Sequence, residues 1–522
     1  MKRPVPIAGA LALLSVIALS QDQSVREITR QELRDKIEGG WAGQMIGVSY
    51  GAPTEFRFRQ AMVPEDRLPK WKPEMVSNAL DQDDLYVDMT LAKVLDDKGL
   101  DATTDDFGAM FKEAKYRLWH ANLAARRALK RGVPATLSGT PKYNAHANDI
   151  DFQIESDFIG LMSPGQFQWT NAMSWRAGRV MNAGDGIYGG MFISGMYAAA
   201  FFDNDTRKIV EAGVACLPAR SPYAMVIKDV LRWSQENPDD WTKTWQAVNE
   251  KWDKREPCPE GALKPFNIDA KLNGAYVALG VLYGKGDFSR TIEVATKAGQ
   301  DSDCNPSSAC GIVGVMRGYK AIPKEWSSGI PPLADQKFNF TDYTFKTIVD
   351  STEKRALALI EKNGGRVKGD KITVKMQKPM AAKLELWDNY GSPVERVPSS
   401  DARWSWKGEW AKPPAGGRGG VRDARVSSIK GAEAAITFNG TGAIVTGPYS
   451  PNGGTAQVYL DGKLDRTVDV YPDEDSTKGG EAVWHIFGLK NGAHTVRLVV
   501  LGQPANGSKG ANIEIEDLVY FR

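Results

Sequence analysis

The feature of this sequence that most constrains its fold is a change of residue periodicity near residue 365. From about residue 26 to that point, small and apolar residues recur at helical spacing, as in the run at 189–202. From residue 371 onward, short segments alternate apolar and polar residues between Asn-Gly and Asp-Gly turn signals. The sequence therefore predicts a multidomain protein, with an all-α helical domain at 26–365 and an all-β, jelly-roll-like sandwich at 371–522.

Individual elements follow from the same patterns. Residues 107–129 are rich in Ala, Lys and Arg, with apolar residues at helical spacing, so we expect helical structure there. We expect a last helix at 345–361, which ends at Asn363-Gly364-Gly365. We expect strands over these segments: 371–374, 382–387, 434–438, 456–460, 495–500 and 513–520.

The charge balance excludes two classes of partner. The chain has 66 basic and 64 acidic residues and a net charge of +2, which favours neither nucleic acid nor an acidic membrane surface. No segment after the N-terminus reaches about 18 uninterrupted apolar residues, so we expect no contact with a membrane once the N-terminal segment is removed. The four cysteines show no zinc-type CxxC spacing.

The N-terminus has the pattern of an export signal. Lys2 and Arg3 precede the apolar run Ile7–Leu19, and Ala18-Leu19-Ser20 resembles a cleavage site. We therefore predict a signal peptide at 1–20 and a secreted or periplasmic protein, with an uncleaved membrane anchor as the alternative.

Glycines recur every four residues at Gly43, Gly47 and Gly51, which predicts a helix with one smooth face. Pro53 then ends the helix, and Glu55 follows in a loop. A carboxylate just beyond a closely packed helix end is well placed to face a cleft; the alternative is an ordinary glutamate in a surface loop.

Two acidic clusters carry the strongest chemical signal. Gln82-Asp83-Asp84 and Asp301-Ser302-Asp303 each stand at the head of a helix pattern. Neighbouring carboxylates repel one another unless a cation neutralises them, and hard oxygen ligands suit Mg²⁺. The alternatives are an acidic first helical turn and a helix cap, but two such clusters in one helical domain predict a shared metal site.

These motifs, in this order, resemble the ADP-ribosylglycohydrolase family. Gly43 to Glu55 follows the family's G-x-x-x-G-D-x-x-G-x-x-x-E element, and Gln82 to Leu85 occupies the place of its T-D-D-[ST] element. Gly299 to Asn305 matches the closing G-G-D-T-D-[TS]-N element, with substitutions. The resemblance covers about residues 26–335 and implies an all-α bundle that binds Mg²⁺, as one or two ions, in a central cleft.

The resemblance also assigns roles to residues. It implies metal ligands at Gln82, Asp83, Asp84, Asp301 and Asp303, and catalytic roles for Glu55, Asp84 and Asp303. The sequence departs from the family pattern at Val48, Leu85 and Cys304, which replace an aspartate and two hydroxyl residues.

Four further residues are candidates for substrate binding. Asp149 and Asp151 lie in a segment that alternates polar and apolar residues, so their carboxylates can share a face. Asp185 lies in a glycine-rich loop that could approach a sugar closely, with a tight turn as the alternative. Asn305 closes the second acidic motif.

We therefore predict a metal-dependent glycoside hydrolase that cleaves a ribosyl or other glycosyl N- or O-glycosidic bond in a small molecule or a glycan. The alternative is a non-catalytic, exported carbohydrate-binding protein with a degenerate metal site; a metal-dependent phosphoesterase is a third interpretation. Aromatic residues of the β region favour a carbohydrate-binding module or, equally, a sandwich core: Trp404, Trp406, Trp410, Tyr449, Tyr471 and Trp484.

Overall fold

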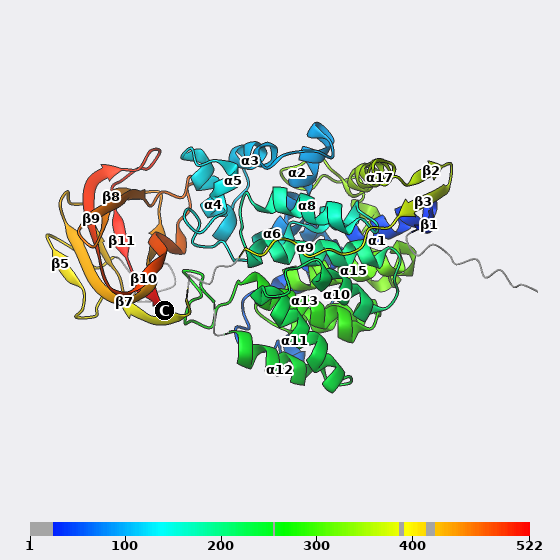
Figure 1. Cartoon of the computed structure of the whole chain (residues 1–522), viewed down its shortest axis with the longest axis horizontal. Helices are drawn as coiled ribbons and strands as arrows, with labels where there is room; N and C mark the ends of the chain where they lie inside the picture. The colour runs from blue at the N-terminus through cyan, green and yellow to red at the C-terminus, as the bar shows by residue number, and fades with distance from the viewer. Residues whose placement is uncertain (1–24, 254–255, 386–390, 414–422) are drawn as a thin grey trace, which may run out of the picture.

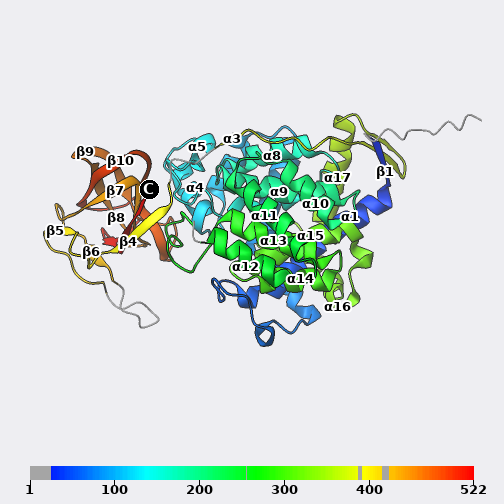
Figure 2. The same cartoon turned by 60° about the horizontal axis from the view of Figure 1, so that its bottom comes forward.

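The computed structural model describes residues 25–253, 256–385, 391–413 and 423–522, so the predicted signal peptide at 1–20 lies outside the described residues. Helices occupy one end of the molecule and a body of strands occupies the other (Figure 1), and the same separation holds in a second view (Figure 2). The predicted fold class, an all-α region followed by a β-sandwich, is confirmed.

The helical region is built around helices that are apolar on all sides. Every residue of α9 and α13 is buried, which is expected only for helices surrounded by others. The α-helices are α1 (Arg30–Gly51), α2 (Asp83–Lys98), α3 (Thr104–Glu113), α4 (His120–Lys130), α5 (Ala135–Ser138), α6 (Asp151–Ile154), α7 (Asp157–Leu161), α8 (Phe167–Gly178), α9 (Asp185–Ala200), α10 (Thr206–Ala215), α11 (Pro222–Glu236), α12 (Trp241–Trp252), α13 (Ala270–Gly284), α14 (Phe288–Lys297), α15 (Cys304–Arg317), α16 (Lys324–Ser327) and α17 (Phe345–Lys362). The short 3₁₀ helices are η1 (Ala52–Thr54), η2 (Glu65–Arg67), η3 (Pro73–Asp81), η5 (Tyr319–Ala321) and η6 (Pro331–Leu333).

The helical structure predicted at 107–129 is present but interrupted at 114–119. The chain forms α3 and α4, with an irregular segment between them that buries Tyr116 and Leu118. The first amides of α4, those of Ala121 and Asn122, donate hydrogen bonds to the Asp151 carboxylate at 3.3 and 2.9 Å. A cap supplied by a distant residue therefore starts a new helix at His120.

The glycine face of α1 packs directly on the backbone of α15. A Cβ atom at Gly43 would lie 2.2 Å from the carbonyl oxygen of Cys310, and one at Gly47 would lie 2.2 Å from that of Pro306. A Cβ at Gly51 would meet the Ser302 oxygen at 2.0 Å. This close approach brings the C-terminal end of α1 to the start of α15, where the second acidic cluster lies.

We expect Gly47→Ala to lower the free energy of unfolding by about 3 kcal/mol, because the new methyl group meets a backbone carbonyl that cannot rotate away. Thermal unfolding of the purified chain measures the change. Gly479→Ala is the control, since a Cβ at that position has no atom within 4 Å. Equal effects of the two substitutions would contradict this packing.

The β region contains a seven-stranded antiparallel sheet in the order β4-β12-β7-β10-β8-β9, with β5 paired to β7, and a separate β11-β6 pair. A third sheet, β1-β3-β2, is attached to the helical region. The strands are β1 (Val25–Thr29), β2 (Arg366–Lys368), β3 (Lys371–Lys375), β4 (Pro393–Pro398), β5 (Ser405–Lys407), β6 (Arg425–Ser427), β7 (Glu433–Tyr449), β8 (Gly454–Leu460), β9 (Lys463–Asp469), β10 (Lys478–Pro504), β11 (Ile513–Ile515) and β12 (Asp517–Phe521).

Two predicted strands behave differently from the others. The one at 371–374 forms as β3, but it pairs with β1 and β2, so the seven-stranded sheet begins at β4 and not at residue 371. Residues 382–385 form no strand, and 386–387 lie outside the described residues. The Ala382 amide donates to the Cys216 carbonyl and the Tyr188 hydroxyl to the Lys383 carbonyl, both at 2.9 Å. This connecting segment therefore lies along the helices (Figure 1).

The sandwich docks on the helical region through arginine side chains. Arg127 and Arg131 of α4 donate to the Asp469 carboxylate at the end of β9, at 3.0 and 2.6 Å. Arg396 of β4 donates through Nε to the Ala262 carbonyl oxygen at 3.0 Å. The sandwich therefore contacts both α4 and the segment that leads to α13.

We expect Asp469→Asn to weaken this docking by about 2 kcal/mol at pH 7, because hydrogen bonds between charged groups are lost. Burial alone would raise the pKa of Asp469, but the hydrogen bond from Arg131 and the charge of Arg127 outweigh it and hold that pKa at about 2. The contribution is therefore complete above the ordinary carboxyl pKa of about 4, and is lost as the pH falls toward 2. Thermal unfolding of both chains across this range should show the difference vanish at low pH. Asp475→Asn, in an exposed pair with Lys509, is the control.

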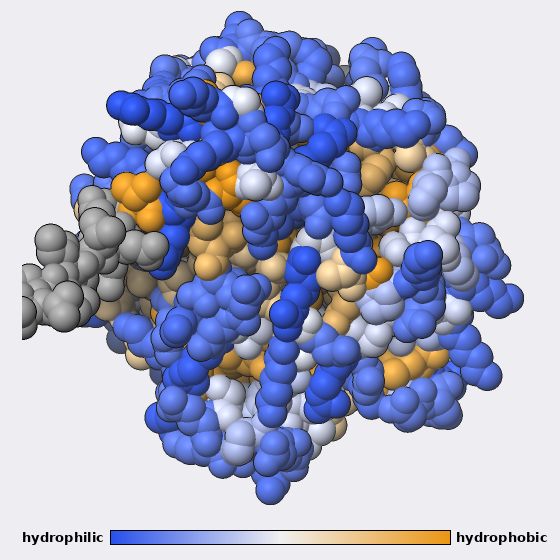
Figure 3. Space-filling model, turned by 90° about the vertical axis from the view of Figure 1, so that its right-hand side faces the viewer, coloured by the Kyte–Doolittle hydropathy of each residue, from blue (hydrophilic) through white to orange (hydrophobic). Residues whose placement is uncertain are grey.

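The end of the helical region away from the sandwich is largely hydrophilic, with small separate hydrophobic patches (Figure 3). Among the residues that the structure describes, no helix combines the length and the apolar character needed to cross a bilayer.

Candidate active site

The two acidic clusters meet at one cavity. Asp83 begins α2, and Asp301 lies just before α15, and both line a cavity of about 370 Å³. Its other lining residues come from the loop after α1, from the end of η3, from α2, from the start of α4 and the residues just before it, from α6 and the residue before it, from the segment before α13 and from the start of α15. The full lining is Glu55, Phe56, Asp81, Gln82, Asp83, Tyr86, Leu118, Trp119, His120, Asn122, Ile150, Asp151, Ile154, Glu260, Phe266, Ile268, Asp301 and Cys304.

Glu55 reaches this cavity because the loop after α1 is tied to the loop before α15. The Phe56 amide donates to the Gln300 carbonyl at 2.8 Å, and the hydroxyl oxygens of Thr54 and Ser302 lie 2.8 Å apart. Gln300 itself has a φ of +52°, a backbone conformation that L-residues seldom adopt. These contacts fix Glu55 beside the second acidic cluster.

The donor atoms of the clusters fit a divalent cation. Ligand atoms of Asp301, Asp303 and Cys304 lie within 4.8 Å of one another. One carboxylate oxygen on each of Asp84, Asp301 and Asp303 is buried and has no hydrogen-bond partner. Because buried oxygens without partners are costly, these atoms are suited to binding a hard cation such as Mg²⁺.

Cys304 stands where the family pattern has a hydroxyl residue, and its side chain makes a different kind of contact. Its thiol donates a hydrogen bond to Asp84 Oδ2 at 3.2 Å, and burial raises its pKa well above the ordinary value. A protonated thiol is a poor ligand for Mg²⁺ but can orient Asp84. Val48 and Leu85, the other two departures, are buried in the hydrophobic core.

The carboxylates strongly perturb one another. The negative charge of Asp303, followed by desolvation and the charge of Asp83, raises the pKa of Glu55 to about 8. Desolvation and Asp303 raise the pKa of Asp83 to about 6. Burial and Asp303 raise the pKa of Asp301 well above its usual range. A bound cation would relieve this repulsion, and a group like Glu55 can hold a proton near neutral pH.

The four candidate substrate residues lie in different places. Asp151 lines the cavity while it caps α4. Asp149 does not line it; its carboxylate contacts His146. Asp185 accepts from the Tyr223 amide at 3.2 Å, and the Asn305 side chain donates to Asn273 at 3.0 Å; neither lines the cavity.

Sequence reasoning missed an aromatic and polar wall of the cavity. Trp119 and His120 reach it because α3 and α4 are separate, a break that the apolar pattern conceals. Phe266 and Glu260 belong to the irregular segment between α12 and α13. No local motif marks these four residues, so only the tertiary arrangement could have identified them.

Several aromatic residues of the sandwich are in its core. Trp404, Tyr449 and Trp484 are buried, and the Arg127 guanidinium lies 3.7 Å from the centre of the Tyr449 ring. Trp406 and Trp410 are only partly buried, with ring centres 4.8 Å apart. Tyr471 is also only partly buried. A sugar-binding role for the sandwich therefore stays a prediction, now confined to Trp406, Trp410 and Tyr471.

Comparison with known proteins agrees with this geometry. Residues 29–364 match the family model described as ADP-ribosylglycohydrolase. One curated relative, the A type blood alpha-D-galactosamine galactosaminidase of Flavonifractor plautii, is 42% identical over 69 residues, which are 13% of this chain and 6% of that protein. The chain therefore matches only a small part of the relative's length.

Two solved structures are also similar. An "ADP-ribosylglycohydrolase-related protein complex" is 16% identical with a TM-score of 0.40, and the match covers 62% of this chain and 98% of that chain. A "Carbohydrate-Binding Module CBM36 in complex with calcium and xylotriose" is 7% identical with a TM-score of 0.18, over 25% of this chain and 100% of that chain.

Proposed function

The chain belongs to the ADP-ribosylglycohydrolase family and is a glycosidase-like hydrolase, and we propose that it hydrolyses a glycosidic bond with the help of a divalent cation. The observation that carries this proposal is the meeting of Glu55 and the two acidic clusters at one cavity. Asp83, Asp84, Asp301 and Asp303 would hold the cation, with Gln82 at the rim of the same cavity.

The protein's own groups supply most of the remaining chemistry. Glu55 can hold a proton at its carboxyl group and deliver it to the leaving-group oxygen or nitrogen, as a general acid does. Asp151 and Asn122 offer polar atoms for sugar hydroxyls, and Tyr86 and Trp119 offer aromatic faces against which a sugar ring can stack. When bound, Mg²⁺ would orient sugar hydroxyls and polarise water.

The charge of the cavity bears on the substrate. Its described lining includes no lysine or arginine and six carboxylates: Glu55, Asp81, Asp83, Asp151, Glu260 and Asp301. The cation would neutralise Asp83 and Asp301, but the remaining carboxylates disfavour the pyrophosphate of ADP-ribose and attract a positively charged sugar. We therefore propose a glycan substrate, and specifically an amino sugar, which is also the substrate class in the printed name of the Flavonifractor plautii relative.

A panel of nitrophenyl glycosides and ADP-ribosyl conjugates, assayed with Mg²⁺ and after chelation, tests the proposal. We expect amino-sugar glycosides to be cleaved fastest. Chelation should lower the rate at least about 100-fold, which corresponds to about 3 kcal/mol of activation free energy. Faster cleavage of ADP-ribosyl conjugates would overturn the substrate proposal. No turnover of any compound, with or without metal, would favour a carbohydrate-binding protein with a degenerate site.

We also propose that the enzyme acts outside the cytoplasm. The support is the basic pair Lys2-Arg3 followed by the apolar run Ile7–Leu19.

A further inference from the structure

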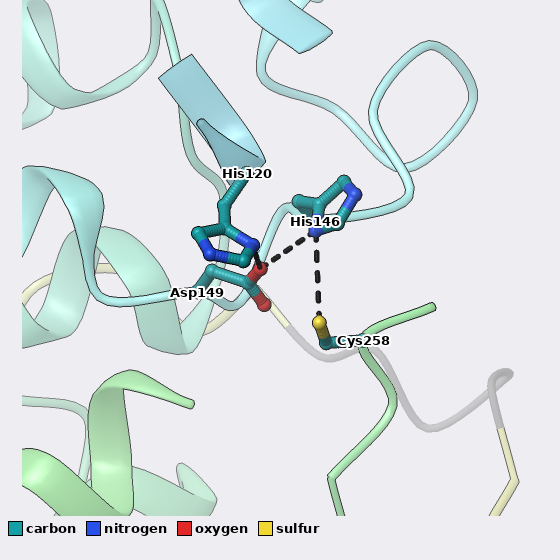
Figure 4. Close-up of side chains that lie close together, drawn as sticks. All are labelled: His120, His146, Asp149 and Cys258. Carbon is teal, nitrogen blue, oxygen red and sulfur yellow. Dashed lines mark hydrogen bonds and ion pairs between the residues drawn. The ribbon is translucent and has the colours of Figure 1, made fainter. Parts of the chain in front are cut away.

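A second group of metal-ligating side chains lies behind one wall of the cavity, separate from the acidic clusters. His120 comes from the start of α4, His146 and Asp149 from the segment between α5 and α6, and Cys258 from the segment between α12 and α13 (Figure 4). One ligand atom from each lies within 4.8 Å of all the others. Only His120 also lines the cavity.

The distances within this group suit a tetrahedral ion. Zinc bonds of about 2.0 Å to nitrogen and oxygen and about 2.3 Å to sulfur put neighbouring ligands about 3.3–3.8 Å apart. His120 Nδ1 lies 3.8 Å from Asp149 Oδ2, and His146 Nδ1 lies 3.7 Å from Cys258 Sγ. The contact of His146 Nδ1 with Asp149 Oδ2, at 2.7 Å, is a hydrogen bond that would open by about 0.6 Å to admit the ion.

Two polar atoms of this group lack a hydrogen-bond partner. His120 Nδ1 and Asp149 Oδ1 are buried and have no hydrogen-bond partner. His120 is held with a φ of +42°, an uncommon conformation that aims its ring at Asp149.

A nucleophilic triad does not explain the group. In such a triad the nucleophile and the acid approach opposite nitrogens of the histidine. Here Glu481 does lie at Nε2 of His146, opposite Cys258, but Asp149 also approaches Nδ1, the nitrogen that faces Cys258. Cys258 is fully buried and does not line the cavity, whereas a nucleophilic cysteine has to be reached by its substrate.

We propose that His120, His146, Asp149 and Cys258 bind one Zn²⁺ ion. Two imidazoles, a thiolate and a carboxylate form a mixed nitrogen, sulfur and oxygen set, which suits Zn²⁺ and differs from the all-oxygen set of the acidic clusters. On binding, Cys258 and any protonated imidazole release their protons to solvent. Four protein ligands leave no open position, so this zinc is structural and not a second catalytic metal.

The surroundings indicate what the ion does. His146 Nε2 lies 3.3 Å from Glu481 Oε2 of β10, the carboxylate–histidine–metal arrangement that orients zinc ligands. The ion would tie α4 to the segment that carries Cys258, Glu260 and Phe266, next to the sandwich. It would thus fix the aromatic wall of the cavity and link its shape to the docking of the sandwich.

Zinc content of the purified full chain tests the proposal. After equilibration with Zn²⁺ alone and removal of the excess, we expect one zinc per wild-type chain by elemental analysis. Cys258→Ser and His146→Gln should bind zinc at least about 100-fold more weakly in a chelator competition, since losing a ligand costs more than losing an outer partner. Cys216→Ser, which removes a buried cysteine outside this group, should keep its zinc.

Cobalt(II) provides a second measurement if a variant fails to fold. The cobalt-loaded wild type should show tetrahedral visible bands and a near-ultraviolet thiolate band, and Cys304→Ser should keep that band. Absence of zinc from the wild type, or zinc kept by Cys258→Ser but lost from Asp301→Asn, would overturn the proposal. Zinc kept without glycoside turnover would instead count against the proposed enzyme activity alone.

Discussion

Replacing Asp301 with asparagine should lower kcat/KM for the best glycoside by about 1,000-fold while the fold stays intact. Asp301 is 2% exposed, lines the cavity and carries a buried oxygen without a partner. Asparagine has the same size but lacks the negative charge, so it cannot hold the cation or orient it in the same way. Steady-state kinetics with Mg²⁺ measures the loss.

The thermal stability of Asp301→Asn distinguishes a metal-binding role of Asp301 from a role in holding the fold together. Burial and the charge of Asp303 raise the pKa of Asp301, so the metal-free protein should be equally stable or more stable with asparagine. Mg²⁺ should raise the Tm of the wild type and not that of the variant. Asp88→Asn is a matched control, because Asp88 is equally buried one turn beyond Asp84 but accepts from the Phe158 amide. A large fall in metal-free Tm with Asp301→Asn, and none with Asp88→Asn, would contradict a metal-binding role.

Much of the fold could be predicted because the relevant signals are local. The four-residue spacing of Gly43, Gly47 and Gly51 describes one helix face, and that face is the one that contacts α15. The acidic clusters were identified because each lies at a helix start, where a short sequence window contains the whole motif. The turn signals and alternation after residue 391 likewise belong to neighbouring residues.

What the sequence did not reveal depends on partners far away in the chain. The break between α3 and α4 is produced by Asp151, which caps α4 from a later segment. The sequence of β3 is typical of a sandwich strand, but β3 pairs with β1 in the sheet attached to the helical region. Cys258 and His120 show no metal-site spacing, because they come from distant segments that only the tertiary structure brings together.

Replacing Glu55 with glutamine should lower kcat by about 1,000-fold with little change in KM, because a carboxyl group that can hold and release a proton is removed from the cavity. The loss should depend on the leaving group. A nitrophenyl leaving group departs readily without a proton, so its glycoside should lose much less activity than an alkyl glycoside of the same sugar.

The leaving-group comparison separates the roles open to Glu55. Equal losses for both glycosides would contradict a general acid and indicate that Glu55 positions substrate or water instead. Glu65→Gln is the matched control: Glu65 follows Glu55 in the same connecting segment but forms an ion pair with Lys297 outside the cavity lining. In the metal-free protein Asp303 contributes most to the raised pKa of Glu55, so Asp303→Asn should lower that pKa. A titration of Glu55 in the metal-free protein that is the same in Asp303→Asn as in the wild type would contradict this coupling.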